Sequence, residues 1–148
     1  MEDAAYNRKW AYLQSYCTQR TKLKRLLWQR EELISLRGKT NDLGTVIQSG
    51  RTSDTTSESV IRLLDNADKI EQKIAEIYSL LGAITQYIED APITETEKLI
   101  LTCRFIRGMK SSDICVEVGH EGANGAMHKR IRRIVRKMPE PKMVRYRV

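Results

Sequence analysis

The sequence predicts an all-α fold, with a long N-terminal helical hairpin or coiled coil followed by three short helices. Three observations carry this prediction. Apolar residues recur at spacings of three and four through residues 6–37 and 57–89. Pro92 then interrupts the pattern, and glycines at 108 and 119 divide the C-terminal part of the chain. With 41% hydrophobic and 30% charged residues among 148, the chain has enough apolar side chains for a core beneath a charged surface.

The first predicted helix covers residues 6–37, which contain neither Gly nor Pro. Its aromatic residues near the N-terminus are interpreted as core or dimer-seam side chains. Gly38 is expected to end the helix, because glycine readily adopts the left-handed conformation that closes many helices. Residues 39–56 are rich in Gly, Ser, Thr, Asn and Asp, which predicts a flexible connection.

The second predicted helix, residues 57–89, has apolar residues at every position of two heptad rows. These nine residues form the predicted seam: Val60, Leu63, Ala67, Ile70, Ile74, Ile77, Leu81, Ile84 and Ile88. Such a repeat keeps one face of the helix against a partner, as in coiled coils. The partner is either the first helix, which gives an antiparallel hairpin, or a second copy of the chain, which gives a homodimer. The sequence leaves both open.

A third helix is expected to begin after Pro92, where Thr94 and Glu97 have the spacing of a capping box. It should stop at Gly108. A fourth helix is predicted over residues 111–118 and should end at Gly119.

The last predicted helix covers residues 123–137, and two prolines beyond it forbid its continuation. Its apolar residues fall on one face: Met127, Ile131, Ile134 and Met138. The expected organisation is therefore a helical hairpin or coiled coil over residues 1–91, a three-helix domain over 92–138 and a basic tail over 139–148.

The positive charge is confined to the C-terminal part of the chain. Residues 1–91 hold 13 basic and 13 acidic residues, whereas residues 92–148 hold 13 basic and 6 acidic residues, which gives that segment the whole net charge of +7. Residues 123–138 contain no acid. A merely solvated helix face usually mixes both signs, so this distribution favours binding to nucleic acid.

A basic helix that buries its apolar face on two short preceding helices is typical of a helix-turn-helix reading the DNA major groove. The partner expected on this basis is double-stranded DNA. Residues near the start of the helix would reach base edges, and cations further along would contact phosphates. The candidate DNA-binding residues are Asn124, Gly125, His128, Lys129, Arg130, Arg132, Arg133, Arg136 and Lys137.

About 45 residues of the C-terminal part also resemble region 4 of bacterial sigma factors. The matching residues are Glu97, Ile100, Leu101, Arg104, Phe105, Ile106, Gly108, Asp113, Ile114 and Gly119. A sigma-like C-terminus behind long helices is similar to phage-encoded regulators of the ArpU and RinA type. This resemblance implies a transcriptional regulator of phage or prophage genes, whose helical hairpin dimerises or contacts RNA polymerase. The segment between Gly119 and the last helix is about two residues longer than the sigma pattern.

Two other functions remain open at this stage. One is a phage interaction protein that inhibits or recruits a host protein or nucleoprotein complex, and the other is an adaptor for DNA packaging similar to a small terminase subunit. An enzyme is not expected, because the sequence has no carboxylate cluster, no phosphate loop and no Ser/His/Asp arrangement.

No cofactor or metal is expected either. Cys103, Cys115, His120 and His128 do not have the spacing of paired zinc ligands, and the cysteines are interpreted as small apolar side chains. The sequence has no run of apolar residues long enough for a membrane span or a secretory signal. The expected location is therefore the cytoplasm of a bacterial host, at the nucleoid.

Overall fold

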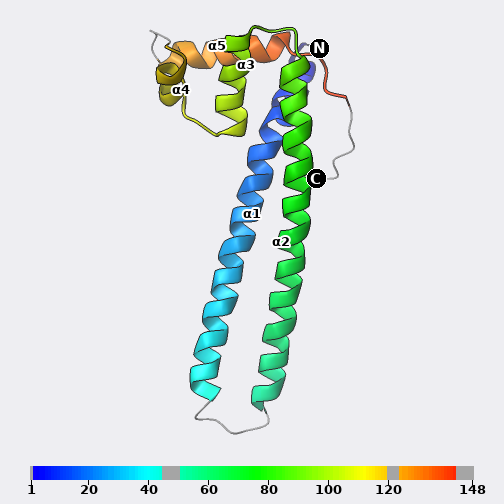
Figure 1. Cartoon of the computed structure of the whole chain (residues 1–148), viewed down its shortest axis with the longest axis vertical. Helices are drawn as coiled ribbons and strands as arrows, with labels where there is room; N and C mark the ends of the chain where they lie inside the picture. Colours follow the sequence, from blue (N-terminus) through cyan, green and yellow to red (C-terminus); the bar gives the residue numbers. More distant parts are fainter. Residues whose placement is uncertain (1, 45–50, 120–123, 143–148) are drawn as a thin grey trace. The chain divides into compact units, whose positions relative to one another are not determined.

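The structure is a computed structural model that describes residues 2–44, 51–119 and 124–142. Over these residues the fold is all-α, as predicted, and contains no strand (Figure 1). The elements, in chain order, are α1 (Glu2–Gly44), α2 (Arg51–Asp90), α3 (Glu95–Leu101), the π-helical segment η1 (Thr102–Ile106), α4 (Ser111–Val118) and α5 (Asn124–Lys137). In this described part, no helix combines the length and the hydropathy that crossing a bilayer requires.

The chain divides into two compact units. The composite unit contains Met1–Thr18 and Tyr78–Val148, and the two-helix unit contains Gln19–Ile77. The composite unit thus joins the first turns of α1 and the last turns of α2 to the three short helices. The predicted boundaries at 91 and 138 differ from this grouping, and they remain a prediction.

The long helices extend further than the sequence pattern indicates. Helix α1 continues through Gly38 to Gly44, and α2 already begins at Arg51. Glycine permits a left-handed helix end but does not impose one, and within a helix it costs only about 1 kcal/mol relative to alanine. The expected connection over residues 39–56 is therefore helical at both ends, and its centre, residues 45–50, lies outside the described residues.

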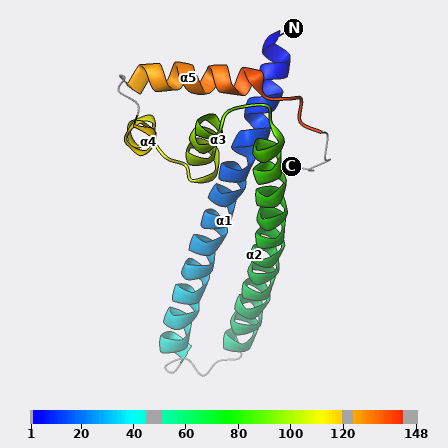
Figure 2. The ribbon, with the colours of Figure 1, turned by 45° about the horizontal axis from the view of Figure 1, so that its top comes forward.

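In the two-helix unit, α1 and α2 run antiparallel (Figures 1 and 2). Asn66 of α2 donates from Nδ2 to the carbonyl oxygen of Leu26 at 3.3 Å and to Oε1 of Gln29 at 3.4 Å. One heptad later, Lys73 Nζ donates to Oε1 of Gln19 at 2.9 Å. These polar contacts fix which residues of the two helices face each other.

The buried face of α2 differs from the predicted seam by one heptad row. In the row of Leu63, the later members Ile70, Ile77 and Ile84 are buried as expected. In the row of Val60, however, Ala67 and Ile74 are exposed, Val60 and Leu81 are half-buried, and only Ile88 is buried. The positions that face inward instead are those of Asn66, Lys73 and Leu80. The imperfect apolar stripe of α1 explains the difference, because polar side chains of α1 pair with polar side chains of α2.

In the composite unit, α3, η1, α4 and α5 pack against one another around a fully buried core. The fully buried side chains of these short helices include Phe105, Ile100, Leu101, Ile114, Met127, Ile131, Ile134 and Val135. The first turns of α1 close this core. The ring of Trp10 meets the ring of Phe105 edge to face, with centroids 5.0 Å apart, and the Cys17 thiol donates to the Phe105 carbonyl oxygen at 3.0 Å.

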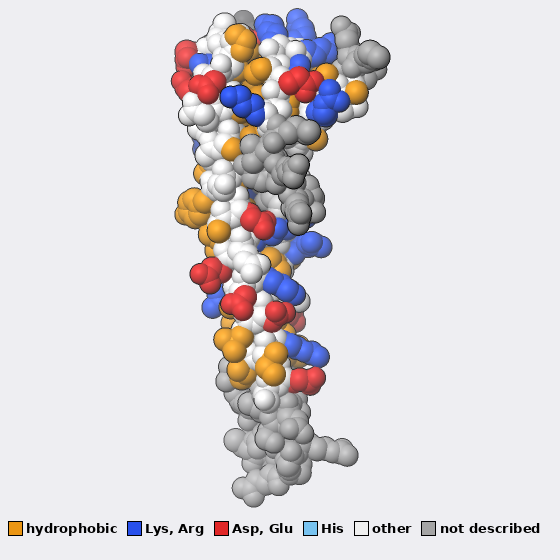
Figure 3. All heavy atoms as spheres, turned by 90° about the vertical axis from the view of Figure 1, so that its right-hand side faces the viewer, with side chains coloured by type: hydrophobic (Ala, Val, Ile, Leu, Met, Phe, Trp, Pro, Cys, Tyr) orange, Lys and Arg blue, Asp and Glu red, His pale blue; other side chains and the backbone are white. Residues whose placement is uncertain are grey.

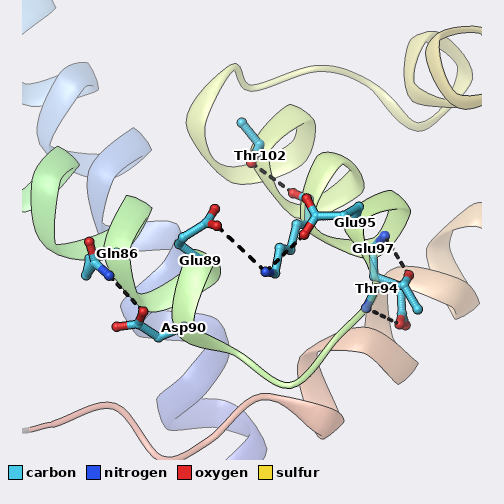
Figure 4. Close-up of polar contacts among 8 residues, drawn as sticks. Gln86, Glu89, Asp90, Thr94, Glu95, Glu97 and Thr102 are labelled. Carbon is cyan, nitrogen blue, oxygen red and sulfur yellow. Dashed lines mark hydrogen bonds and ion pairs between the residues drawn. The ribbon is translucent and has the colours of Figure 1, made fainter.

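The predicted capping box at the start of α3 is confirmed (Figure 4). The Glu97 amide donates to the Thr94 hydroxyl at 3.2 Å, and the Thr94 amide donates to Oε1 of Glu97 at 3.1 Å. The predicted stops are confirmed as well, since Gly108 and Gly119 have φ of 65° and 67°. The π-helical turn that precedes Gly108 was not predicted. There, the Arg107 amide donates to the Thr102 carbonyl oxygen five residues back.

Candidate nucleic-acid interface

Helix α5 has one buried face and one exposed face, because its apolar residues follow the helical period. The predicted inward residues Met127, Ile131, Ile134 and Met138 are all at most 2% exposed. Val135, which was not among the predicted inward residues, is also fully buried. Packing on α3 and α4 therefore holds α5 firmly, so that its opposite face is presented to solvent.

The exposed face of α5 carries cations and no carboxylate. Lys129, Arg132 and Arg133 are exposed, and none of the three forms an ion pair within the described part of the chain. Uncompensated guanidinium and ammonium groups on a rigid helix suit the binding of phosphate oxygens. This face is the chemical centre of the candidate interface.

Two further predicted residues at the end of α5 are exposed but already have intramolecular contacts. Lys137 Nζ lies 3.0 Å from Oε2 of Glu97. The guanidinium of Arg136 lies over the ring of Tyr6, 5.6 Å from its centroid, and Lys9 Nζ donates to the Arg136 carbonyl oxygen at 3.4 Å. A phosphate bound by Lys137 or Arg136 would therefore share that side chain with its intramolecular contact.

Glu97 is nearly buried, at 9% exposure, yet it is stabilised as a carboxylate. The hydrogen bond from the Thr94 backbone amide lowers its pKa most, and Lys137 lowers it further, while burial acts in the opposite direction. Glu97 therefore ties the last turn of α5 to the first turn of α3 through a charged group.

The residues expected to read base edges lie in the first turns of α5. The helix begins at Asn124, whose side chain lies outside the described residues, as do residues 120–123 of the preceding turn. Gly125 and His128 are exposed, and a Cβ at position 125 would meet no atom within 4 Å. Arg130 is half-buried and has an interaction within the protein. The exposed positions leave room for a ligand at the start of the helix.

The structure also brings residues of α1 beside α5, a contact that the sequence pattern does not predict. An open cleft is lined by Tyr6, Asn7, Trp10, His128, Arg132 and Arg136. Tyr6 and Trp10 were interpreted as core or seam residues, and both are half-buried. The spacing of four residues between Tyr6 and Trp10 places both rings on one face of α1. That spacing does not indicate which other helix the two rings contact.

The segment after α5 is held against the long helices of the composite unit. Arg8 Nη2 donates to Oε1 of Glu140 at 2.9 Å, and the Tyr87 hydroxyl donates to the Pro139 carbonyl oxygen. The hydrogen bond from Arg8 lowers the pKa of Glu140, and burial raises the pKa of Tyr87. Residues 143–148 of the predicted basic tail lie outside the described residues.

Among the described residues, no group of three or more His, Cys, Asp or Glu side chains is arranged to hold a metal ion. Cys103 and Cys115 are buried and free. Burial raises the pKa of the Cys103 thiol, so this cysteine is a poor nucleophile. His120, one member of the imagined zinc set, lies outside the described residues.

No family model matches the sequence, and no curated protein or solved structure shows significant similarity to it.

Proposed function

We propose that the chain is a sequence-specific DNA-binding protein that regulates transcription of phage or prophage genes. In this proposal α3 with η1, α4 and α5 act as a helix-turn-helix, and α5 enters the major groove. The observation that carries the proposal is the exposed face of α5, where Lys129, Arg132 and Arg133 have no acidic partner among the described residues. The resemblance to sigma factor region 4 and to regulators of the ArpU and RinA type supports it.

The division of labour along α5 follows from the way a recognition helix docks. Its first turns approach the bases, so Gly125, His128 and Lys129 would determine which site is bound. Arg132, Arg133 and Arg136, further along the helix, would contact phosphates and supply affinity that depends little on sequence. The site of action would be the nucleoid in the cytoplasm of a bacterial host.

The phosphate contacts are tested by replacing Arg132, Arg133 and Arg136 together with alanine. The variant should bind every duplex more weakly, and the slope of log K against log salt should become shallower by roughly 2 to 3, because about one counterion is released for each phosphate neutralised. The measurement is fluorescence anisotropy with a labelled duplex at several salt concentrations.

A matched control replaces three exposed arginines of the two-helix unit, Arg25, Arg30 and Arg62, with alanine. This control changes the net charge by the same amount but should leave the salt slope within error of the original chain. Equal slopes for the two triple variants would contradict the assignment of α5 as the DNA-binding helix.

A protein partner is the second candidate function, and the surface of the two-helix unit favours it. Trp28, Ile34 and Leu36 of α1 and Ile61 and Leu64 of α2 are each more than half exposed. Figure 3 shows hydrophobic side chains at the surface among charged ones along the face turned to the viewer. A regulator could use such a surface to bind RNA polymerase, another host protein or a second copy of the chain. The distinguishing observation is stable capture of one host protein by a chain that binds no duplex.

A further inference from the structure

The cleft lies between α5 and the first turns of α1. It has a volume of about 650 Å³ and is open to solvent. All of its lining residues belong to the composite unit. The volume lies within the range of sites that hold small molecules or single groups of larger ones. The chemistry of its walls therefore decides which kind of ligand it suits.

One wall of the cleft is aromatic and is held in place by the core. The rings of Tyr6 and Trp10 have centroids 6.0 Å apart and are inclined by 32°. Trp10 is held in turn by its edge-to-face contact with Phe105, which is fully buried. Both residues are half-buried rather than buried and both line the open cleft, so a ligand in the cleft would contact them.

The other wall is positively charged. Arg132 and Arg136 lie one helical turn apart on α5, and both line the cleft. The Arg136 guanidinium lies over the ring of Tyr6, 5.6 Å from its centroid. Asn7 and His128 add hydrogen-bonding groups, and no carboxylate is among the lining residues that the structure describes.

A ligand that fits both walls must combine a flat apolar group with a negative charge. Free phosphate needs no aromatic wall, and a neutral aromatic compound needs no pair of guanidinium groups. A nucleotide has both parts, because its base stacks on aromatic or guanidinium planes while its phosphate pairs with cations. In an intact duplex the bases are stacked inside the double helix and cannot reach a wall of this kind.

We propose that the cleft binds one unpaired nucleotide of a single-stranded nucleic acid, with its base against Trp10 and its phosphate on Arg132 and Arg136. This goes beyond the proposed binding of duplex DNA, in which α5 alone enters the groove. It gives the first turns of α1 a role in recognition and would let the protein hold a strand that has left the duplex.

The experiment uses the full chain with Trp28→Phe, which leaves Trp10 as the only tryptophan. Titration with a ten-residue oligothymidylate should quench Trp10 emission in a saturable way, because stacking of a base places it in contact with the indole. The Asn7→Asp variant should bind this strand roughly tenfold more weakly, since it puts a carboxylate beside the phosphate site. Arg132→Gln should weaken binding to a similar extent.

Gln72→Glu, at an exposed position of α2, is the matched control for Asn7→Asp because it changes the net charge by the same unit. It should bind the strand as the parent chain does. Circular dichroism should show equal helicity for all variants, since Asn7 and Gln72 are both exposed.

Unchanged Trp10 emission with the strand bound, or equal weakening by Asn7→Asp and Gln72→Glu, would overturn the proposal. So would quenching by a duplex with the same sensitivity to Asn7→Asp, because the cleft would then take the duplex backbone. A variant with Lys129→Gln and Arg133→Gln separates this inference from the proposed function: it should bind the duplex much more weakly and retain quenching by oligothymidylate.

Discussion

At the scale of single residues, Glu97 makes more contacts than any pattern in the sequence indicates. Its spacing from Thr94 predicts the capping box, which the structure confirms. The spacing does not predict the ion pair with Lys137, 40 residues later, because that contact exists only after α3 and α5 pack together. A side chain expected to begin one helix therefore also joins two.

Substitution of Glu97 by glutamine should reduce stability in a way that depends on pH. The pKa of Glu97 is lowered from its ordinary value of 4.5, so its carboxylate stabilises the folded state above that pH. The stabilisation is lost as the pH falls through the lowered pKa. Urea unfolding should show Glu97→Gln less stable by about 0.5 to 1 kcal/mol at pH 7, with the difference closing towards pH 3.

The control for this prediction is Glu95→Gln. Glu95 lies in the same first turn and pairs with Lys98 at 3.3 Å, but its side chain is 86% exposed. An exposed pair of this kind contributes little, so the control should change stability slightly at either pH. A loss at Glu97→Gln that stays constant from pH 7 to pH 3 would show that its charge does not matter.

At the scale of elements, the sequence predicts best those helix termini that carry a local chemical signal, such as a capping box or a glycine in the left-handed conformation. Helix α4 spans Ser111–Val118 as expected, and Gly119 closes it in the left-handed conformation. The ends of α1 and α2 were predicted less well, because glycine permits a helix to stop but does not force it to. The π-helical turn at Thr102–Ile106 contains the buried residues Cys103 and Phe105, and the spacing of residues in the sequence does not distinguish such a turn from an α-helix.

Two glycine-to-alanine substitutions should have opposite effects. At Gly119, φ is 67°, so Gly119→Ala should destabilise the protein by about 1 kcal/mol through backbone strain alone. At Gly82, inside α2, a Cβ meets no atom within 4 Å, and Gly82→Ala should stabilise by up to about 1 kcal/mol. The midpoints of urea unfolding give the change in stability of each variant. Changes of the same sign in Gly119→Ala and Gly82→Ala would contradict the conformational argument.

The candidate site was predicted in part. Periodicity alone separated the buried face of α5 from its cationic face, and the structure confirms that Lys129, Arg132 and Arg133 are exposed. The aromatic wall of the cleft was missed, because Tyr6 and Trp10 meet α5 across more than 100 residues of chain. No local pattern indicates a contact of that kind.

At the scale of the whole molecule, the composite unit depends on both ends of the chain. Trp10 packs on Phe105, Cys17 bonds to the Phe105 carbonyl, and Arg8 pairs with Glu140. The core of the three short helices is therefore completed by the first turns of α1. Residues 1–18 therefore belong to the composite unit, and the boundary placed at residue 91 from charge and composition remains a prediction.

Trp10→Ala should consequently destabilise helices that are distant from it in sequence. Loss of a half-buried indole should cost roughly 2 kcal/mol, and hydrogen exchange should become faster in α3 and α5, as expected when a cooperative unit is weakened. Trp28→Ala is the matched control, because Trp28 is 58% exposed; it should leave the exchange of these helices unchanged. Faster exchange confined to α1 in the Trp10 variant would support an independent C-terminal domain instead.

The polar contacts between α1 and α2 also determine the register of the two helices. If α2 slipped by one heptad, most of its apolar positions would again meet apolar positions, so the hydrophobic cost would be small. Asn66, however, would leave the Leu26 carbonyl and Gln29, and Lys73 would leave Gln19. Asn66 is only 3% exposed, and leaving its buried amide nitrogen without an acceptor would cost about 1 to 3 kcal/mol. The partners of one asparagine and one lysine thus favour the observed alignment over others that the heptad repeat alone would allow.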